Sequence, residues 1–356
     1  MTHIIRPSTL NKLKPLLQQR YAKADFNTFR PQHHRLANRP PSKDLLKSIR
    51  NQTHVSTTLA THLLSKEFPN SNVVFSPLSI HVALSIVAAD LKDGAADEVN
   101  LWAEKQTNGI IKQVISANAI DDLTWLIFSN AVYFKGEWVE KFEENETEES
   151  DFHLLDGNKV QVPFMTNDED QFVREYEDFK VLGLPYLQGQ DIREFTMYFF
   201  LPHAKDGLQS LIEKIGSTSD FFNRHIPRQK VKVGEFLIPK FKISFGFEAS
   251  NMLKDLGLVL PFNHEDGMTE MVDSSLGQRV YVSDIYQKSF VEVNEEGTEA
   301  TSVSACFGRA SSPMTKYDRV DFVADHPFLF VVREDVTNVV LFMGQVIDPR
   351  VDRKSI

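Results

Sequence analysis

The chain of 356 residues is long enough for about two ordinary domains or one large one. Its 42% of apolar residues, with 27 phenylalanines, favour a globular protein over a disordered one. The sequence contains no run of 18 or more apolar residues, which argues against a transmembrane helix. The net charge of −10 is unevenly placed, because residues 1–50 carry eleven Lys or Arg against two acidic residues. The acidic remainder is a poor match for a polyphosphate backbone, so we expect neither a membrane nor a nucleic acid as partner.

The chain begins with a basic segment over residues 1–44 that several prolines interrupt. Polar, proline-rich segments bury too little apolar surface to order themselves, so we expect a disordered extension. An organelle transit peptide is the alternative, because residues 1–24 contain no acidic residue. No secretory signal is visible, and a single cysteine, Cys306, excludes an internal disulfide. Both features favour a reducing, cytoplasmic location.

Helices are predicted in the next part of the chain. Apolar residues recur at helical spacing over residues 45–64, with Ser42 or Asp44 as the candidate N-cap. Residues 73–90 predict a short strand and then an almost wholly apolar, hence buried, helix that begins at a Ser-Pro pair. A further helix is expected over residues 97–115, with its first part ending at Gly109.

Beyond Leu123, β-strands dominate. Segments rich in β-branched and aromatic residues are separated by Gly, Pro or Asn-Asp breaks, at residues 123–138, 179–187, 194–202, 229–247, 279–297, 321–335 and 338–349. Several of them lack apolar–polar alternation, so we expect them to be covered on both faces in the middle of large sheets. The predicted fold class is a single α+β domain from about residue 45 to the C-terminus, residue 356.

Sequence signatures of enzymes are absent. The chain has no G-x-S-x-G, H-E-x-x-H, G-x-x-x-x-G-K-[ST] or G-x-G-x-x-G motif, so no catalytic residues are predicted. The eleven histidines are scattered, and we predict no metal or cofactor site. The acidic segment at residues 143–151 is interpreted as a solvated turn rather than as a cation site.

The segment VEVNEEGTEATSVSACFGRASSPMTKYD, residues 291–318, begins as a strand and then loses its large apolar anchors. At period two, Thr298, Ala300, Ser302 and Ser304 form a uniformly small face. Small side chains allow a strand to enter a crowded space between two existing strands. From composition alone a solvated linker is the simpler interpretation, although long loops without structure of their own are usually functional or disordered.

The neighbouring motifs favour the functional interpretation. Two segments resemble the hinge and the C-terminal signature of the serpins: EVNEEGTEA at residues 292–300 and DFVADHPFLFVVREDVTNVVLFMGQVIDP at residues 321–349. The residues of these motifs are most similar to those of plant serpins. Further matches extend the resemblance over roughly residues 50–350, among them NVVFSPLSI, VNLWAEKQTNGII, SNAVYFKGEW, FHLLDGNKV, VLGLPYLQG and IPKFKISFGFEAS. The resemblance implies a serpin fold with several sheets, packed helices and an exposed reactive-centre loop at about residues 295–319.

The resemblance also implies a function, that of a serine-type protease inhibitor rather than an enzyme. In this family a protease is acylated at a bait bond in the loop, and the freed loop inserts as a new central strand that distorts the protease before deacylation. The implied partner is a serine or papain-like cysteine protease, and we expect a monomer without a cofactor. A non-inhibitory homologue that acts as a binding protein, or a degenerate variant, is the alternative.

Site residues transfer position by position. Counting forward from the hinge glycine and back from Asp321 places the bait bond at Ser311–Ser312, with cleavage after Arg309 as the alternative for a trypsin-like protease. The family's hinge falls on Glu295, Glu296, Gly297, Thr298, Glu299 and Ala300. The region where the loop first enters the sheet, and the polar cluster beneath it, fall on Trp138, Lys240, Ser76, Ser79, Asn130 and Gln287. We expect Lys240 to pair with Glu295, and Gln287 stands where the family usually has histidine.

One departure from the family pattern lies between Asp90 and Val99. In serpins, further helices and two edge strands of the main sheet separate the buried helix that ends near Ala89 from the helix around Trp102. Here only a few residues span that gap. We therefore expect the outer edge of the strand that contains Asn130 to lack its usual partners, and a bare sheet edge favours aggregation.

Overall fold

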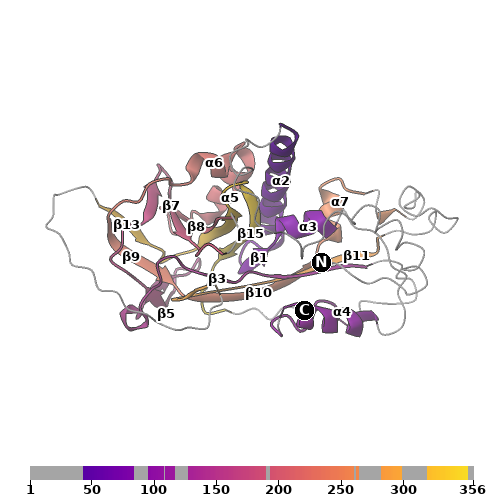
Figure 1. Cartoon of the computed structure of the whole chain (residues 1–356), viewed down its shortest axis with the longest axis horizontal. Coiled ribbons are helices and arrows are strands. Elements are labelled where there is room, and N and C mark those ends of the chain that lie inside the picture. Colours follow the sequence, from indigo (N-terminus) through magenta and orange to yellow (C-terminus); the bar gives the residue numbers. More distant parts are fainter. Residues whose placement is uncertain are drawn as a thin grey trace, which may run out of the picture.

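The computed structural model describes residues 43–83, 95–107, 109–116, 127–189, 193–259, 262–263, 282–298 and 319–351. These residues form three β-sheets with helices packed around them (Figure 1). The predicted extension is outside the described residues as far as residue 42. The mixture of helices and several sheets agrees with the predicted α+β class.

The helices begin close to the predicted positions. Their bounds are α2 Lys43–His62, a π-helical turn η1 Leu63–Glu67, α3 Pro77–Ala83, α4 Ala95–Gln106, a 3-10 turn η3 Glu144–Glu146, α5 Leu208–Ser217, α6 Phe221–His225 and α7 Ser250–Asp255. Helix α3 starts at the Ser-Pro pair, where the Ser76 hydroxyl accepts a hydrogen bond from the backbone N–H of Ser79 at 3.2 Å. Gly109 has a φ of +85°, as expected for a residue that follows a helix. None of the helices among the described residues is long and apolar enough to cross a membrane.

A six-stranded sheet forms the phenylalanine-rich centre of the molecule. Its strands, in spatial order, are β1 Val73–Phe75, β15 Val339–Val346, β14 Phe328–Glu334, β8 Phe195–Pro202, β7 Phe179–Pro185 and β6 Phe172–Glu175. Every residue of β14 is buried, and so is every residue of β8 after the first. The absence of alternation in these two strands therefore correctly indicated cover on both faces.

A second sheet contains the segment of greatest functional interest. It is built from β10 Phe241–Glu248, β11 Asp284–Asn294, β12 Gly297–Thr298, β3 Gly136–Glu137 and β2 Ile127–Tyr133. Strand β2 runs parallel to the first part of β11, whereas β12 is antiparallel to the last part of the same strand. Helices α3 and α4 both contact β2, and in Figure 1 α4 lies below the sheet while α3 lies above it.

The third sheet has four strands, β13 Val320–Val323, β9 Val233–Pro239, β5 Lys159–Met165 and β4 Glu148–His153. Strand β4 corrects one prediction, because the acidic segment at residues 143–151 is only partly a turn. Residues Glu144–Glu146 form the 3-10 turn, and the rest of that segment leads into β4, which pairs with β5 over six residue pairs.

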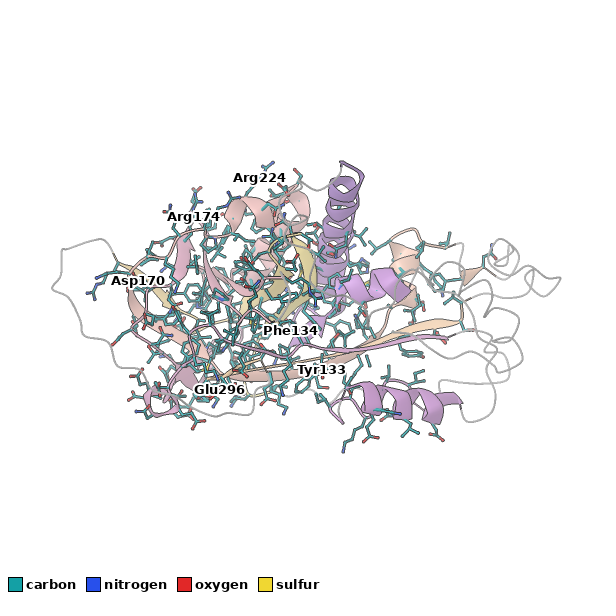
Figure 2. The ribbon with its side chains drawn as sticks, viewed as in Figure 1. Tyr133, Phe134, Asp170, Arg174, Arg224 and Glu296 are labelled. Carbon is teal, nitrogen blue, oxygen red and sulfur yellow. The ribbon has the colours of Figure 1, made fainter. Side chains whose placement is uncertain are left out.

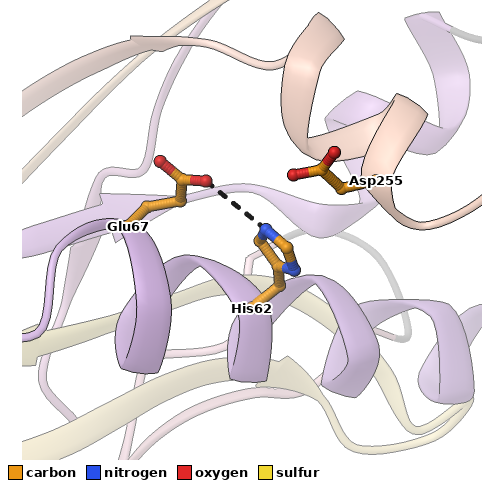
Figure 3. A group of neighbouring side chains, drawn as sticks. All are labelled: His62, Glu67 and Asp255. Carbon is orange, nitrogen blue, oxygen red and sulfur yellow. Dashed lines mark ion pairs between the residues drawn. The ribbon is translucent and has the colours of Figure 1, made fainter.

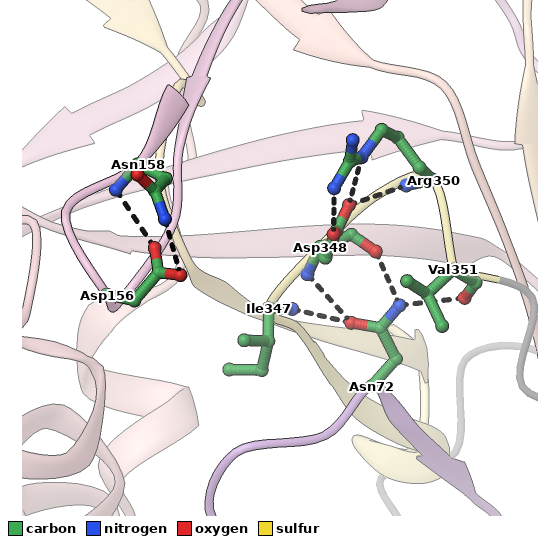
Figure 4. Close-up of polar contacts among 7 residues, drawn as sticks. All are labelled: Asn72, Asp156, Asn158, Ile347, Asp348, Arg350 and Val351. Atoms are coloured by element: carbon green, nitrogen blue, oxygen red, sulfur yellow. Dashed lines mark hydrogen bonds and ion pairs between the residues drawn. The ribbon is translucent and has the colours of Figure 1, made fainter. Parts of the chain in front are cut away.

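A polar network holds the C-terminal part of the described chain against β1 (Figure 4). The Asn72 amide nitrogen donates to the carbonyls of Asp348 at 2.6 Å and Val351 at 3.0 Å. Its amide oxygen accepts from the backbone N–H groups of Ile347 at 2.7 Å and Asp348 at 3.0 Å. One buried side chain thus satisfies four backbone groups after the last strand.

Candidate hinge and loop-insertion site

The predicted hinge begins where β11 ends, at Asn294. The Asn294 side-chain oxygen accepts hydrogen bonds from the backbone N–H groups of Glu296 at 3.1 Å and Gly297 at 3.2 Å, which closes a tight turn. The chain then reverses into β12, where Gly297 and Thr298 pair with Asn294 and Val293 of β11. On its other side β12 pairs with β3. The first residues of the predicted loop therefore already lie as a strand inside the sheet.

Gly297 has the only residue type that fits its position. Its φ of +152° is rarely adopted by residues with a side chain, and a Cβ atom would lie 2.1 Å from the carbonyl oxygen of Gly136. A Cβ atom on Gly136 would in turn lie 2.7 Å from the ring of Tyr186. Two glycines thus allow the turn and β3 to approach closely at the point where the hinge enters the sheet.

Trp138 fixes this entry point. Its backbone N–H donates to the carbonyl of Glu296 at 3.0 Å, and its indole N–H donates to the carbonyl of Asn294 at 2.9 Å. The indole ring stacks on Tyr186 with a centroid separation of 4.5 Å. The Tyr186 hydroxyl lies 2.6 Å from the hydroxyl of Thr298, whose side chain is fully buried. Burial raises the pKa of Tyr186 far above its usual range, so the phenol stays neutral.

Two ion pairs hold the hinge carboxylates. Glu295 is 5% exposed, and its carboxylate accepts hydrogen bonds from the Lys240 ammonium at 2.8 Å and from the Thr147 hydroxyl at 2.8 Å. Burial alone would raise the pKa of Glu295, but the hydrogen bonds from Lys240, from a backbone N–H and from Thr147, together with the Lys240 charge, outweigh burial and the pKa is lowered. The Lys141 ammonium pairs with Glu296, and mainly this hydrogen bond raises the pKa of Lys141. Figure 2 labels Glu296, and also Tyr133, the last residue of β2, and Phe134 directly after it.

The polar cluster predicted beneath the sheet lies farther along β11. The Gln287 side-chain N–H donates to the backbone carbonyl of Ser76 at 2.9 Å, and Ser79 is joined to the Ser76 hydroxyl as described above. Gln287 is opposite Asn130 in the β2–β11 register. The side chain of Asn130 is outside the described residues, so the cluster is defined by Ser76, Ser79 and Gln287. The Gln287 amide oxygen is buried and has no hydrogen-bond partner in the described part of the chain.

The two parts of β11 show where a longer inserted strand would go. Its first part pairs with β2 over seven residue pairs, from Asp284 opposite Ile127 to Phe290 opposite Tyr133. Its last part pairs with β12 on the same edge, and β12 separates β11 from β3. Extension of β12 would therefore require β2 to move away from β11.

The expectation that the outer edge of β2 lacks its usual partners stays a prediction, because residues 84–94 and 117–126 lie outside the described residues. Among the described residues β2 pairs only with β11. Helix α4 and the segment after it cover part of its face, through a small apolar cluster in which Ala103 and Ile111 pack with Phe290, Ala131 and Tyr133. No strand of the described chain lies beside the other edge.

Other site predictions have mixed outcomes. The structure brings together six of the predicted residues, and the expected Lys240–Glu295 pair is formed. The six are Trp138, Lys240, Glu295, Glu296, Gly297 and Thr298. The remaining hinge and bait residues Glu299, Ala300, Arg309, Ser311 and Ser312 lie outside the described residues. Sequence reasoning missed Tyr186, Thr147 and Lys141. Tyr186 was in the quoted motif VLGLPYLQG, which could have singled it out, whereas nothing in the local pattern distinguished the other two.

Comparisons with known proteins agree with this architecture. The family model for serpins, described as serine protease inhibitors, matches residues 89–349. The chain is 46% identical to Serpin-ZX of Arabidopsis thaliana, with 86% of this chain and 99% of that protein covered, and 53% identical to Serpin-ZX of Hordeum vulgare, with 72% and 64% covered. The solved structure of Arabidopsis AtSerpin1, in its native stressed conformation, matches with a TM-score of 0.75 at 42% identity, over 87% of this chain and 100% of that one.

The alignment with the Arabidopsis protein also supports an internal deletion. It runs over 388 positions but contains 86% of this 356-residue chain, so about 80 positions of the relative have no counterpart here. The family model and the structural match nevertheless cover most of the chain. The chain belongs to the serpin family, whose members are protease inhibitors and not catalytic enzymes.

Proposed function

We propose that this chain inhibits proteases by inserting its cleaved loop, from Thr298 onward, into the second sheet. The inserted strand would have β11 on one side and β3, followed by β2, on the other. The observation that carries this proposal is the position of Gly297 and Thr298, which are paired with β11 on one side and β3 on the other. Each further residue that entered would continue this strand toward Gln287. The small face of Thr298, Ala300, Ser302 and Ser304 suits such a path.

The energetics favour insertion once the loop is cut. The β2–β11 hydrogen bonds that break on opening are replaced by bonds from each strand to the inserted one, so the sheet gains one strand. At about 1 kcal/mol for each net hydrogen bond, about ten inserted residues would gain a free energy comparable to the ~5–15 kcal/mol of an ordinary fold. A gain of this size is sufficient to distort a tethered enzyme.

The target we propose is a serine protease or a papain-like cysteine protease that cuts at Ser311–Ser312, or after Arg309 in the trypsin-like case. The test is to incubate the full chain with trypsin, chymotrypsin and papain separately and to resolve the products by denaturing electrophoresis and mass spectrometry. We expect a covalent adduct that survives denaturation, and a released C-terminal peptide that begins at Ser312 or Ala310. Size-exclusion chromatography should show a monomer before the reaction.

A second candidate function has its own supporting observation. A non-inhibitory homologue that acts as a binding protein is favoured by the outer edge of β2, which has no partner strand among the described residues. An edge strand frays more easily than a central one, and insertion that is too slow would release the protease intact. Cleavage within residues 299–318 by all three proteases, without an adduct at any ratio, would support this second function.

A further inference from the structure

Three side chains of types that can bind metal ions lie close together, far from the hinge in sequence (Figure 3). They are His62 at the end of α2, Glu67 at the end of η1 and Asp255 at the end of α7. One donor atom from each of them lies within 4.8 Å of the other two. Residues nearly two hundred positions apart thus place one nitrogen and two carboxylate oxygens close enough together to surround one ion.

The π-helical turn explains how Glu67 reaches His62. In an α-helix each residue turns about 100°, so residues five apart would project about 140° away from each other. The π pattern, in which the backbone N–H of Phe68 donates to the carbonyl of Leu63 at 2.9 Å, closes a turn over five residues. Glu67 therefore lies above His62, with a carboxylate oxygen 3.4 Å from the His62 Nε2 atom.

This distance fits a tetrahedral ion. Zn²⁺ binds imidazole nitrogen and carboxylate oxygen at about 2.0–2.2 Å, and two such donors on a tetrahedral ion are about 3.4 Å apart. The His62 and Glu67 donors already have this separation. The Asp255 carboxylate faces them from α7, with its donor atom within 4.8 Å of the other two, and would supply the third ligand (Figure 3).

Charge favours a cation at the same point. Glu67 and Asp255 are each the last residue of a helical element, where the helix dipole is negative and a cation is stabilising. Neither carboxylate has a Lys or Arg within salt-bridge distance in the described part of the chain. Lys254, the neighbour of Asp255, instead has its ammonium 4.9 Å from the centroid of the Phe262 ring.

We propose that His62, Glu67 and Asp255 bind a divalent transition-metal ion of the Zn²⁺ type, with water as the fourth ligand. One imidazole with two carboxylates is a donor set that suits such ions, and it balances their charge. The ion would join the end of α2 to α7, the helix that directly follows β10. Because it binds the folded chain and these donors separate on unfolding, it would raise the melting temperature without a part in protease capture.

The test uses the full chain after treatment with a chelator. Zn²⁺ is titrated by calorimetry, Co²⁺ is titrated by visible absorption, and the melting temperature is recorded with and without Zn²⁺. We expect one ion per chain at this site, a Co²⁺ spectrum of low-coordinate type and a higher melting temperature. Glu67→Gln, Asp255→Asn and His62→Gln each remove a direct ligand, so each should weaken binding by more than the ~10–100-fold that loss of an outer-shell partner costs.

Two controls separate this site from other histidines. His203→Gln removes another His–Glu pair, an exposed one in which His203 Nε2 lies 3.7 Å from Glu175 Oε1, and it should leave binding unchanged. The double variant His33→Gln with His34→Gln tests the adjacent histidines of the N-terminal segment. If His62→Gln fails to fold, the two carboxylate variants are decisive, because their amides keep size and shape. Equal Zn²⁺ affinity in the parent chain and Asp255→Asn would overturn the proposal, and so would loss of binding only in the His33, His34 variant.

Discussion

At the residue scale, the Glu295 carboxylate is a buried charge at the hinge whose pKa depends on its hydrogen-bond donors. Hydrogen bonds from Lys240 and Thr147 lower its pKa in the folded protein despite burial. A lowered pKa means that its contribution to stability is complete above the unfolded pKa of about 4.3 and is lost as the pH falls through the folded value. The hinge anchor should therefore hold at neutral pH and weaken in acid.

Glu295→Gln tests this anchor with almost no change in shape. We expect the free energy of unfolding to fall by about 1–2 kcal/mol at neutral pH, because a charge-assisted hydrogen bond is replaced by a neutral one. The difference between the parent chain and the variant should stay constant down to about pH 5 and then shrink as the pH is lowered to about 3 in denaturant titrations, because the folded pKa lies below the unfolded value. A difference that stays constant down to about pH 3 would show that the Glu295 charge does not stabilise the fold, and Glu296→Gln provides the comparison at a less buried carboxylate, whose side chain is 15% exposed.

Gly297 is the second residue whose surroundings predict the effect of a substitution. An alanine there places Cβ 2.1 Å from the Gly136 carbonyl oxygen, in a backbone conformation that L-residues avoid. Gly297→Ala should therefore expel β12 from the sheet, with a loss of about 1–3 kcal/mol in stability. Limited proteolysis of residues 295–300 should become faster than in the parent chain. Gly157→Ala, at a φ of +85° with open space around it, is the matched control for backbone strain alone.

At the scale of elements, the short strand β12 decides between the two candidate functions. The side chain of Thr298 is 0% exposed and lies between β11, β3 and Tyr186, so there is no room for a larger side chain. Thr298→Arg should stop insertion, so that the protease cleaves the loop and leaves without an adduct. Thr298→Val keeps the shape and loses only the bond to Tyr186, so it should still form the adduct, with stability lower by about 1 kcal/mol. Equal adduct yields from the parent chain and both variants would contradict the proposed route.

The strands differ in how well the sequence could predict them. Strands such as β8 and β14 were predictable because both of their faces are buried, so each is a continuous apolar run rich in β-branched and aromatic residues. Such a run is long enough for a strand but shorter than a typical helix. Strand β4 was missed because it carries glutamate and aspartate, which are depleted in strands, and tertiary pairing with β5 overrides that preference. Lys240 was placed opposite Glu295 through family positions. Thr147 was not, since a contact across 148 residues leaves no local signal.

At the scale of the whole molecule, the missing segment and the proposed insertion act on the same strand. Strand β2 must move away from β11 to admit the loop, and it must then hold the inserted strand on its other side. In the described chain β2 is supported by α4 and α3 rather than by a further strand. Movement of β2 should thus be easier than in a wider sheet, while the product is less firmly held.

Insertion of the loop beside β2 can be measured by comparing the intact and nicked protein in calorimetry. If residues beyond Thr298 become a full strand, about ten net hydrogen bonds at about 1 kcal/mol each should raise the melting temperature by more than about 10 °C. A frayed β2 edge would reduce the rise, and an unpaired loop would abolish it. The parent chain and Thr298→Arg, both cut by the same protease, form the decisive pair, since the cut is identical and only insertion differs. A rise in both would mean that the gain comes from cleavage itself, whereas a rise confined to the parent chain would assign it to the new strand between β11 and β2.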